Sequence, residues 1–140
     1  NSKMFVVNAD IIQYRLSNME KWQAKRNEIA SWYEMELSND VICPIVAPGL
    51  EHNFHKYVIR FEDKAQRKRV KDILKSVGLN PSIHYEKTLS ANSIYNNVKH
   101  ISDDCINSLL VADTVMSLPI HPFVTEETVY RISNTILMEV

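Results

Sequence analysis

The chain has 140 residues, of which 45% are hydrophobic and 24% charged, and a net charge of −1. This length is typical of one domain with its own core, and the near-neutral charge argues against nucleic acid as a partner. Neither a membrane-spanning apolar run nor a signal-peptide pattern is visible, so we expect no membrane partner and a cytoplasmic location. Only two glycines, Gly49 and Gly78, are present, which argues against a phosphate-cradling loop and a self-sufficient cofactor site.

Residues 3–37 contain neither proline nor glycine. Their apolar residues step by four and three, which is the spacing of one helical stripe. We therefore expect one long helix, interrupted near Ser17–Asn18, with core roles for its apolar side chains. A helix of this length at the edge of a domain also tends to pack on something outside it. The stripe consists of Phe5, Ala9, Ile12, Leu16 and Met19, continued by Ile29, Tyr33 and Leu37.

The middle of the chain alternates connector, strand and helix. Residues 38–53 hold two prolines and a glycine and indicate an extended connector. Residues 55–61 alternate sides and are rich in β-formers, which predicts a strand. Asp63 is suited to cap the next helix, with Gln66 completing a capping box, and Gly78 is suited to end it. The expected buried stripe of this helix is Val70, Ile73, Leu74 and Val77.

The outward face of the same helix is strongly basic. A charged helix face usually meets solvent, and we favour that interpretation, with an acidic partner as the alternative. The cluster consists of Lys64, Arg67, Lys68, Arg69, Lys71 and Lys75.

The C-terminal half continues the alternation. Residues 82–85 predict a second short strand, and residues 86–101 predict a polar surface loop. Ser102 is expected to cap a short helix, residues 114–118 form a third strand, and Thr125 caps the last helix. We expect one α+β domain over the whole chain, 1–140, with a long N-terminal helix and a small three-stranded sheet covered by helices. The order and direction of the strands stay open.

The sequence does not group side chains that would support catalysis or bind metal unaided. Cys43 and Cys105 lie far apart without metal-ligand spacing, which favours reduced, buried thiols. His52 and His55 are three residues apart in an expected connector and strand rather than on a helix, so we expect no metal site. No nucleophile-elbow motif surrounds a serine, so we assign no catalytic residue. His121 lies between two prolines and is expected to hydrogen-bond the turn.

Several segments, in order along nearly the whole chain, match the pattern of one enzyme family. They are Asn1-Ser2-Lys3-Met4, the stretch from Trp22 to Tyr33, His55-Lys56-Tyr57-Val58-Ile59-Arg60, His84-Tyr85, and Leu118-Pro119-Ile120-His121-Pro122. Through these segments the chain resembles the DegT/StrS-type sugar aminotransferases. Members of that family use pyridoxal phosphate (PLP) to aminate nucleotide-linked keto-sugars.

The resemblance implies the small C-terminal domain of a fold-type I aminotransferase, acting as a homodimer with glutamate as amino donor. Asn1 would then reach the cofactor phosphate of the neighbouring subunit, and Lys3, His84 and Tyr85 would contact the sugar substrate. In this family the Schiff-base lysine, the aspartate paired with the ring nitrogen and the phosphate loop belong to a large PLP-binding domain that precedes the matched part. We therefore expect this chain alone to bind no PLP and to be inactive.

The chain departs from the family pattern in four places. Phe5-Val6-Val7 replaces a more polar helix segment, Lys3 replaces an arginine, Glu86 replaces a proline, and Ser90 stands where a histidine is frequent. Two hypotheses stay open. The chain is part of an amino-sugar-forming aminotransferase and contributes dimer and sugar-pocket contacts, or it is a free-standing, non-catalytic interaction or regulatory module derived from that domain. The apolar segment at residues 5–7 favours the second.

Overall fold

The computed structural model describes residues 5–95, 97 and 105–140. Two helices open this part of the chain, and two short strands and three further helices follow, together with one short 3-10 turn. In chain order the elements are α1 (Val6–Ser17), α2 (Met19–Leu37), β1 (Tyr57–Arg60), α3 (Lys64–Ser76), η1 (Ser93–Tyr95), α4 (Ile106–Thr114), β2 (Val115–Leu118) and α5 (Glu126–Leu137). The expected cap at Ser102 lies outside the described residues.

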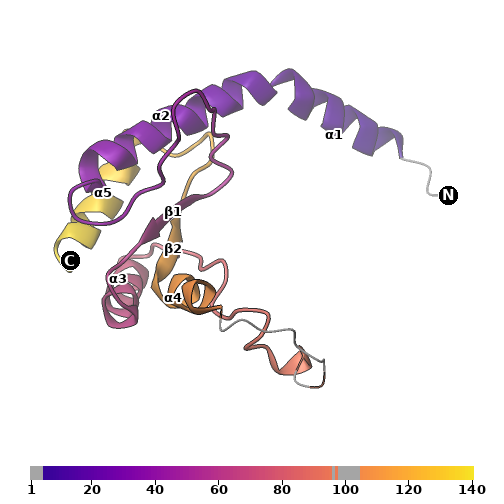
Figure 1. Ribbon diagram of the computed structural model, residues 1–140. Coiled ribbons are helices and arrows are strands. Elements are labelled where there is room, and N and C mark those ends of the chain that lie inside the picture. The colour runs from indigo at the N-terminus through magenta and orange to yellow at the C-terminus, as the bar shows by residue number, and fades with distance from the viewer. Residues whose placement is uncertain (1–4, 96, 98–104) are drawn as a thin grey trace.

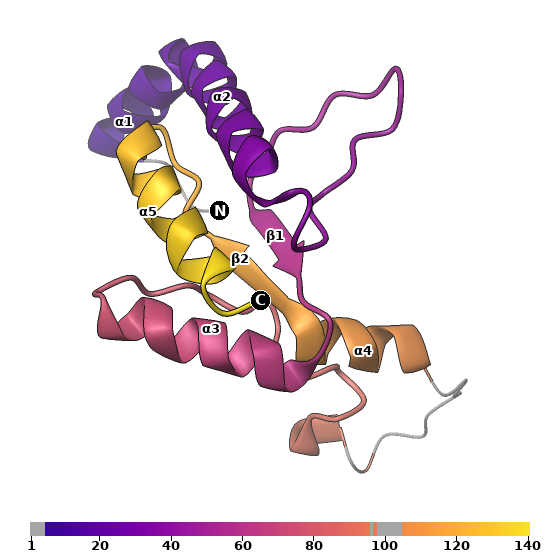
Figure 2. The same ribbon diagram turned by 90° about the vertical axis from the view of Figure 1, so that its left-hand side faces the viewer.

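The sheet confirms the α+β class. Strands β1 and β2 run antiparallel, with Tyr57 opposite Leu118 and Arg60 opposite Val115. In Figure 2, α5 lies in front of the two strands, with α2 on one side and α3 on the other. Helices α2, α3 and α5 therefore cover the strands, and the core forms between them and the sheet.

The expected second strand, residues 82–85, is wrong as a full strand. Ser82 exchanges both backbone hydrogen bonds with Ser117 of β2, at 3.3 and 2.7 Å, and forms an isolated bridge. Pro81 before it has no N–H to donate, and the chain turns at His84 and Tyr85. The sheet therefore has two strands in place of three, and Ser82 forms a single bridge to β2 where the second strand was expected.

The long N-terminal helix breaks where the sequence predicts. Asn18 separates α1 from α2, and its side-chain amide donates to the carbonyl of Tyr14 at 2.9 Å. The Ser17 hydroxyl donates to the same carbonyl, also at 2.9 Å. Side chains that bind a helix carbonyl compete with the backbone ladder, which explains the interruption. In Figure 1, α1 continues beyond α2 and projects away from the other elements.

The expected core role of the α1 side chains is wrong. No residue of α1 is buried, and Phe5 and Val6 expose 79% and 76% of their surface. Helical spacing gave these residues a common stripe, but no element within the described residues covers it. The C-terminal half of α2, by contrast, buries Ile29, Tyr33 and Leu37 as expected.

The core joins α2, both strands, α3 and α5. Tyr33 is central to it, because its ring stacks on Tyr57 with 5.0 Å between centroids and its hydroxyl donates to the carbonyl of Pro119 at 3.0 Å. Burial raises the pKa of Tyr33, so this hydroxyl remains a donor at ordinary pH. The largest fully buried side chains are Tyr33, Tyr57, Phe61, Ile29, Leu37, Ile59, Leu74, Met116, Ile132, Ile136, Val70 and Val129.

The predicted helix ends are confirmed at α3 and α5. Asp63 accepts from the N–H of Gln66 at 2.7 Å, and the Gln66 side chain reaches back to the N–H of Glu62. Gly78, with φ of 82°, follows α3 and takes part in a Schellman pair, Gly78 N–H to Lys75 and Leu79 N–H to Leu74. The expected burial of Val77 is wrong, since it lies in this exposed last turn.

Candidate functional site

The segment around His84 lies beside β2 and contacts one of its side chains. His84 Nδ1 lies 2.9 Å from the hydroxyl of Ser117 on β2. Because Nδ1 is engaged in this contact, Nε2 is the ring nitrogen that is left to contact a further group. His84 itself is partly buried. This hydrogen bond fixes the orientation of the imidazole ring beside β2.

Tyr85 and Glu86 extend the same segment outward. The Tyr85 side chain is 72% exposed, and the ammonium of Lys56 lies 5.8 Å from its ring centroid. Glu86 forms an ion pair with Lys71 of α3 at 2.7 Å. The structure therefore brings together two of the four residues expected at the cofactor and sugar sites, His84 and Tyr85.

The other two expected site residues lie outside the described residues. Asn1 was expected at a cofactor phosphate and Lys3 at the sugar, and both roles stay predictions. Sequence reasoning missed Ser117, Lys56 and Lys71 as supports of the His84 segment. Ser117 lies on β2, Lys71 on α3 and Lys56 just before β1. These side chains reach the His84 segment through tertiary packing, which no local sequence pattern predicts.

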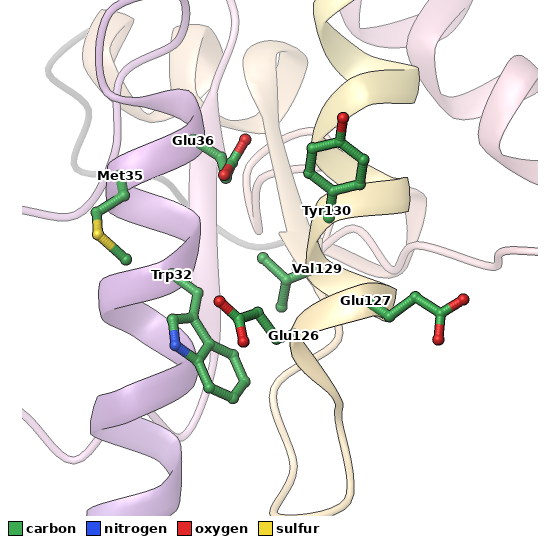
Figure 3. Close-up of a pocket in the computed structure, with 7 residues that line it drawn as sticks. All are labelled: Trp32, Met35, Glu36, Glu126, Glu127, Val129 and Tyr130. Carbon is green, nitrogen blue, oxygen red and sulfur yellow. The ribbon is translucent and has the colours of Figure 1, made fainter.

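A first groove lies between α2 and α5, with a volume of about 330 Å³ (Figure 3). Trp32 forms one wall, and the ammonium of Lys25 lies 4.4 Å from its ring centroid. Three carboxylates line the groove, and two of them occupy the first turn of α5, where the helix dipole favours negative charge. The lining residues are Trp32, Met35, Glu36, Glu126, Glu127, Val129 and Tyr130.

A second groove, of about 370 Å³, lies between α3 and residues 86–87. It is lined by charged side chains, six cationic and two anionic. These residues are Lys64, Arg67, Lys68, Lys71, Asp72, Lys75, Glu86 and Lys87.

Neither groove fits PLP. The carboxylates of the α2–α5 groove would repel the cofactor's phosphate. The α3 groove has cations for a phosphate but, among its lining residues, no apolar or aromatic side chain to face the cofactor ring. Neither of these two grooves therefore offers a PLP site.

The two cysteines, His52 and His121 have ordinary structural surroundings. Burial raises the pKa of the partly buried Cys43 thiol, and nearby Glu34 raises it further, so the thiol stays protonated. Cys105 is exposed, and the expectation that it is buried is wrong. His121 Nδ1 accepts from the N–H of Phe123 at 3.3 Å, the turn contact that the sequence predicts. His52 makes a similar local bond to the N–H of Phe54, at 2.8 Å.

The described residues hold neither a cluster of metal-ligating side chains nor a membrane-spanning helix. No group of three or more potential metal-ligating side chains gathers there. Among the helices described, none combines the length and apolarity that crossing a membrane requires.

The α+β fold of the described residues matches part of a fold-type I aminotransferase. A family model described as the DegT/DnrJ/EryC1/StrS aminotransferase family matches residues 1–137. The chain belongs to this family.

Relatives of known sequence are distant but align along nearly the whole chain. An aminotransferase of Acidithiobacillus ferrooxidans named for UDP-N-acetyl-3-dehydro-alpha-D-glucosamine is 26% identical over 97% of this chain and 36% of its own length. The erythromycin biosynthesis sensory transduction protein EryC1 of Saccharopolyspora erythraea is 23% identical over 97% of this chain and 37% of its own length. The chain thus spans about a third of the relatives it matches.

Solved structures agree. A family aminotransferase from Brucella abortus superposes with a TM-score of 0.87 at 25% identity, over 99% of this chain and 36% of its own. DesV of S. venezuelae, solved with a ketimine intermediate, gives a TM-score of 0.81 at 21% identity, over 90% of this chain and 34% of its own. The second likeness is one of fold alone.

Proposed function

We propose that the chain is the C-terminal part of a PLP-dependent aminotransferase that aminates a nucleotide-linked keto-sugar in amino-sugar biosynthesis. The observation that carries this proposal is the family match over residues 1–137, at about a third of the relatives' length. The part seen here is then a single domain, not catalytic alone, and the reacting lysine and the PLP site belong to a preceding larger domain. Glutamate serves as amino donor, and the enzyme is cytoplasmic.

In this proposal His84 and Tyr85 form one edge of the sugar pocket. The hydrogen bond between His84 Nδ1 and the Ser117 hydroxyl orients the ring, and Nε2 is the nitrogen that would donate to or accept from a sugar hydroxyl. Exposed Tyr85 offers a flat apolar face for the sugar ring. Asn1 reaches the cofactor phosphate across a homodimer interface, and Lys3 adds positive charge beside the substrate.

The first test is the size and chemistry of the cellular protein. Mass spectrometry should find peptides of this chain in a protein about three times as long, and borohydride should fix PLP onto one lysine outside residues 1–140. In that longer protein, His84→Ala should raise KM for the nucleotide sugar by roughly tenfold, from loss of one or two hydrogen bonds to substrate. His55→Ala, which removes an exposed imidazole elsewhere, is the matched control. A cellular protein of 140 residues would overturn the proposal.

The 140-residue chain alone should give no PLP enzyme. Mixed with PLP, it should show no stable internal-aldimine absorption band, because the grooves described above lack a covered cofactor site. A band that borohydride reduction fixes onto one specific lysine of this chain would contradict this expectation.

The second candidate is a free-standing, non-catalytic interaction or regulatory module. The exposed apolar residues of α1 favour it, since such a surface is typical of a docking face. Discovery of a start codon close to Asn1, together with a cellular protein of this length, would select this candidate over the first.

A further inference from the structure

The groove beside α3 concentrates positive charge in a chain whose net charge is −1. Lys64, Lys68, Lys71 and Lys75 follow one another by four, three and four residues, so they form a row along one face of α3. The row is roughly 16 Å long at 1.5 Å per residue. Lys87 faces it from the neighbouring segment and lines the same groove.

Arg67 gives this groove a largely buried cation. Its residue surface is only 8% exposed, and it lines the groove between the lysines. Nη1 donates to the carbonyl of Ala112 at 3.3 Å, but Nε is buried and has no hydrogen-bond acceptor within the part of the chain that the structure describes. A buried cationic donor without an acceptor is costly, and an anion bound beside Arg67 would reduce that cost.

One carboxylate already occupies part of the groove. Glu86 is held by Lys71 at 2.7 Å. The pKa of Glu86 is lowered mainly by its hydrogen bond and charge interaction with Lys71, and further by Arg67 and Lys75. An anionic group at this position is therefore stabilised by three cations from α3. Lys64 is engaged elsewhere, with Asp113 at 2.7 Å, whereas the ion pairs of the described residues include none for Lys68, Lys75 or Lys87.

We propose that the groove between α3 and residues 86–87 binds a small anion that carries two or more linked phosphate groups. One phosphate takes the place of the Glu86 carboxylate beside Lys71 and Arg67, and the linked phosphate lies next to it along the row, on the side of Lys68 or on the side of Lys75. Linked phosphates suit the site because the lining is entirely charged and the cations are spread along a row. This inference goes beyond the proposed function, since it requires neither the cofactor nor a sugar.

The test is calorimetric titration of the 140-residue chain with inorganic pyrophosphate, compared with inorganic phosphate and citrate. Pyrophosphate should bind at least about tenfold more tightly than the other two, because it alone offers two linked phosphates to the row. Equal affinity for all three anions, or no binding of pyrophosphate, would overturn the proposal.

Variants with equal charge change locate the site. Lys68→Gln with Lys75→Gln removes two groove cations, and Lys21→Gln with Arg69→Gln removes two cations that do not line the groove. The groove pair should weaken pyrophosphate binding by roughly tenfold or more, and the control pair by less than about twofold at 0.15 M salt, where distant charges are screened. If both pairs weakened pyrophosphate binding equally, the effect would be a general one of charge, and the proposed location of the site would be wrong.

Glu86→Gln is a control in which we expect binding to improve. A gain in affinity cannot be explained by misfolding of the variant. The substitution removes the competing carboxylate and leaves Lys71 free, so pyrophosphate affinity should rise by several fold at 0.15 M salt. A weaker affinity in Glu86→Gln, with the unfolding midpoint unchanged, would also overturn the proposal.

Discussion

Helices α1 and α5 are each 12 residues long and rich in aliphatic side chains, but they differ in how far those side chains are buried. α5 gathers Val129, Ile132 and Ile136 on one face and buries them. α1 carries two pairs of adjacent aliphatic residues, Val6–Val7 and Ile11–Ile12. Successive side chains of a helix point about 100° apart, so the two members of each pair face different directions. The apolar residues of α1 therefore surround the axis and are all exposed.

The ends of the two helices differ in the same sense. Thr125 accepts from the N–H of Thr128 at 3.2 Å, and two glutamates occupy the first turn of α5. α1 begins after Phe5, which makes no side-chain cap, and its first turn holds no acidic residue. α5 is therefore specified by its own sequence and by its packing on the sheet. The apolar residues of α1 would become buried only against another surface.

The largest contrast is expected from deleting aliphatic side chains. Ile132→Ala in α5 should lower the free energy of unfolding by about 2–5 kcal/mol, because it leaves a cavity in the core. Ile12→Ala in α1 should change it by less than about 0.5 kcal/mol, because that side chain is exposed. Urea unfolding at low protein concentration measures both. Similar losses would show that α1 is packed within this chain in solution.

The second contrast concerns association. We expect the isolated chain to self-associate through α1, since a helix apolar on several faces is stabilised by burying them. Val6→Ser with Val7→Ser should shift the solution mass toward monomer, weakening the dimer by roughly tenfold or more through loss of buried apolar area. Ile45→Ser with Leu89→Ser, at exposed apolar positions outside α1, should not. Light scattering that finds the wild-type chain strictly monomeric at high concentration would rule this out.

The features that the sequence predicts depend on residues close together in the chain. The features that it misses depend on residues far apart in the chain. The caps at Asp63 and Thr125 and the stop at Gly78 depend on neighbouring residues, and all three were predictable. The exposure of α1 was not, because a periodic pattern identifies an apolar stripe but not what covers it. The resemblance to a family pointed to His84, but its partner Ser117 depends on Ser82 pairing beside β2. That pairing is a long-range choice that strand propensity does not reveal.

A smaller effect separates the two helix starts. Thr125→Ala removes the side-chain cap of α5 and should cost about 1 kcal/mol of unfolding free energy. Phe5→Ala removes no capping bond and should cost less than about 0.5 kcal/mol. Thermal or urea unfolding of both variants checks the difference, and an equal cost would mean that the Thr125 bond contributes nothing in water.

The smallest effect is expected in the turn that leads into α5. His121 is exposed and accepts one bond from the N–H of Phe123 at 3.3 Å, so its loss leaves groups that water can satisfy. His121→Ala should therefore cost about 0.5 kcal/mol, the lower end of the net worth of a hydrogen bond. His55→Ala, where the structure gives the ring no hydrogen bond within the described residues, should cost less. A structural role for His121 predicts a small but measurable fall in the unfolding midpoint, with turnover of the longer protein unchanged at a temperature where both variants are folded. An unchanged midpoint with a large loss of turnover would instead place His121 at the reacting atoms, and would make the start of α5 part of the active site.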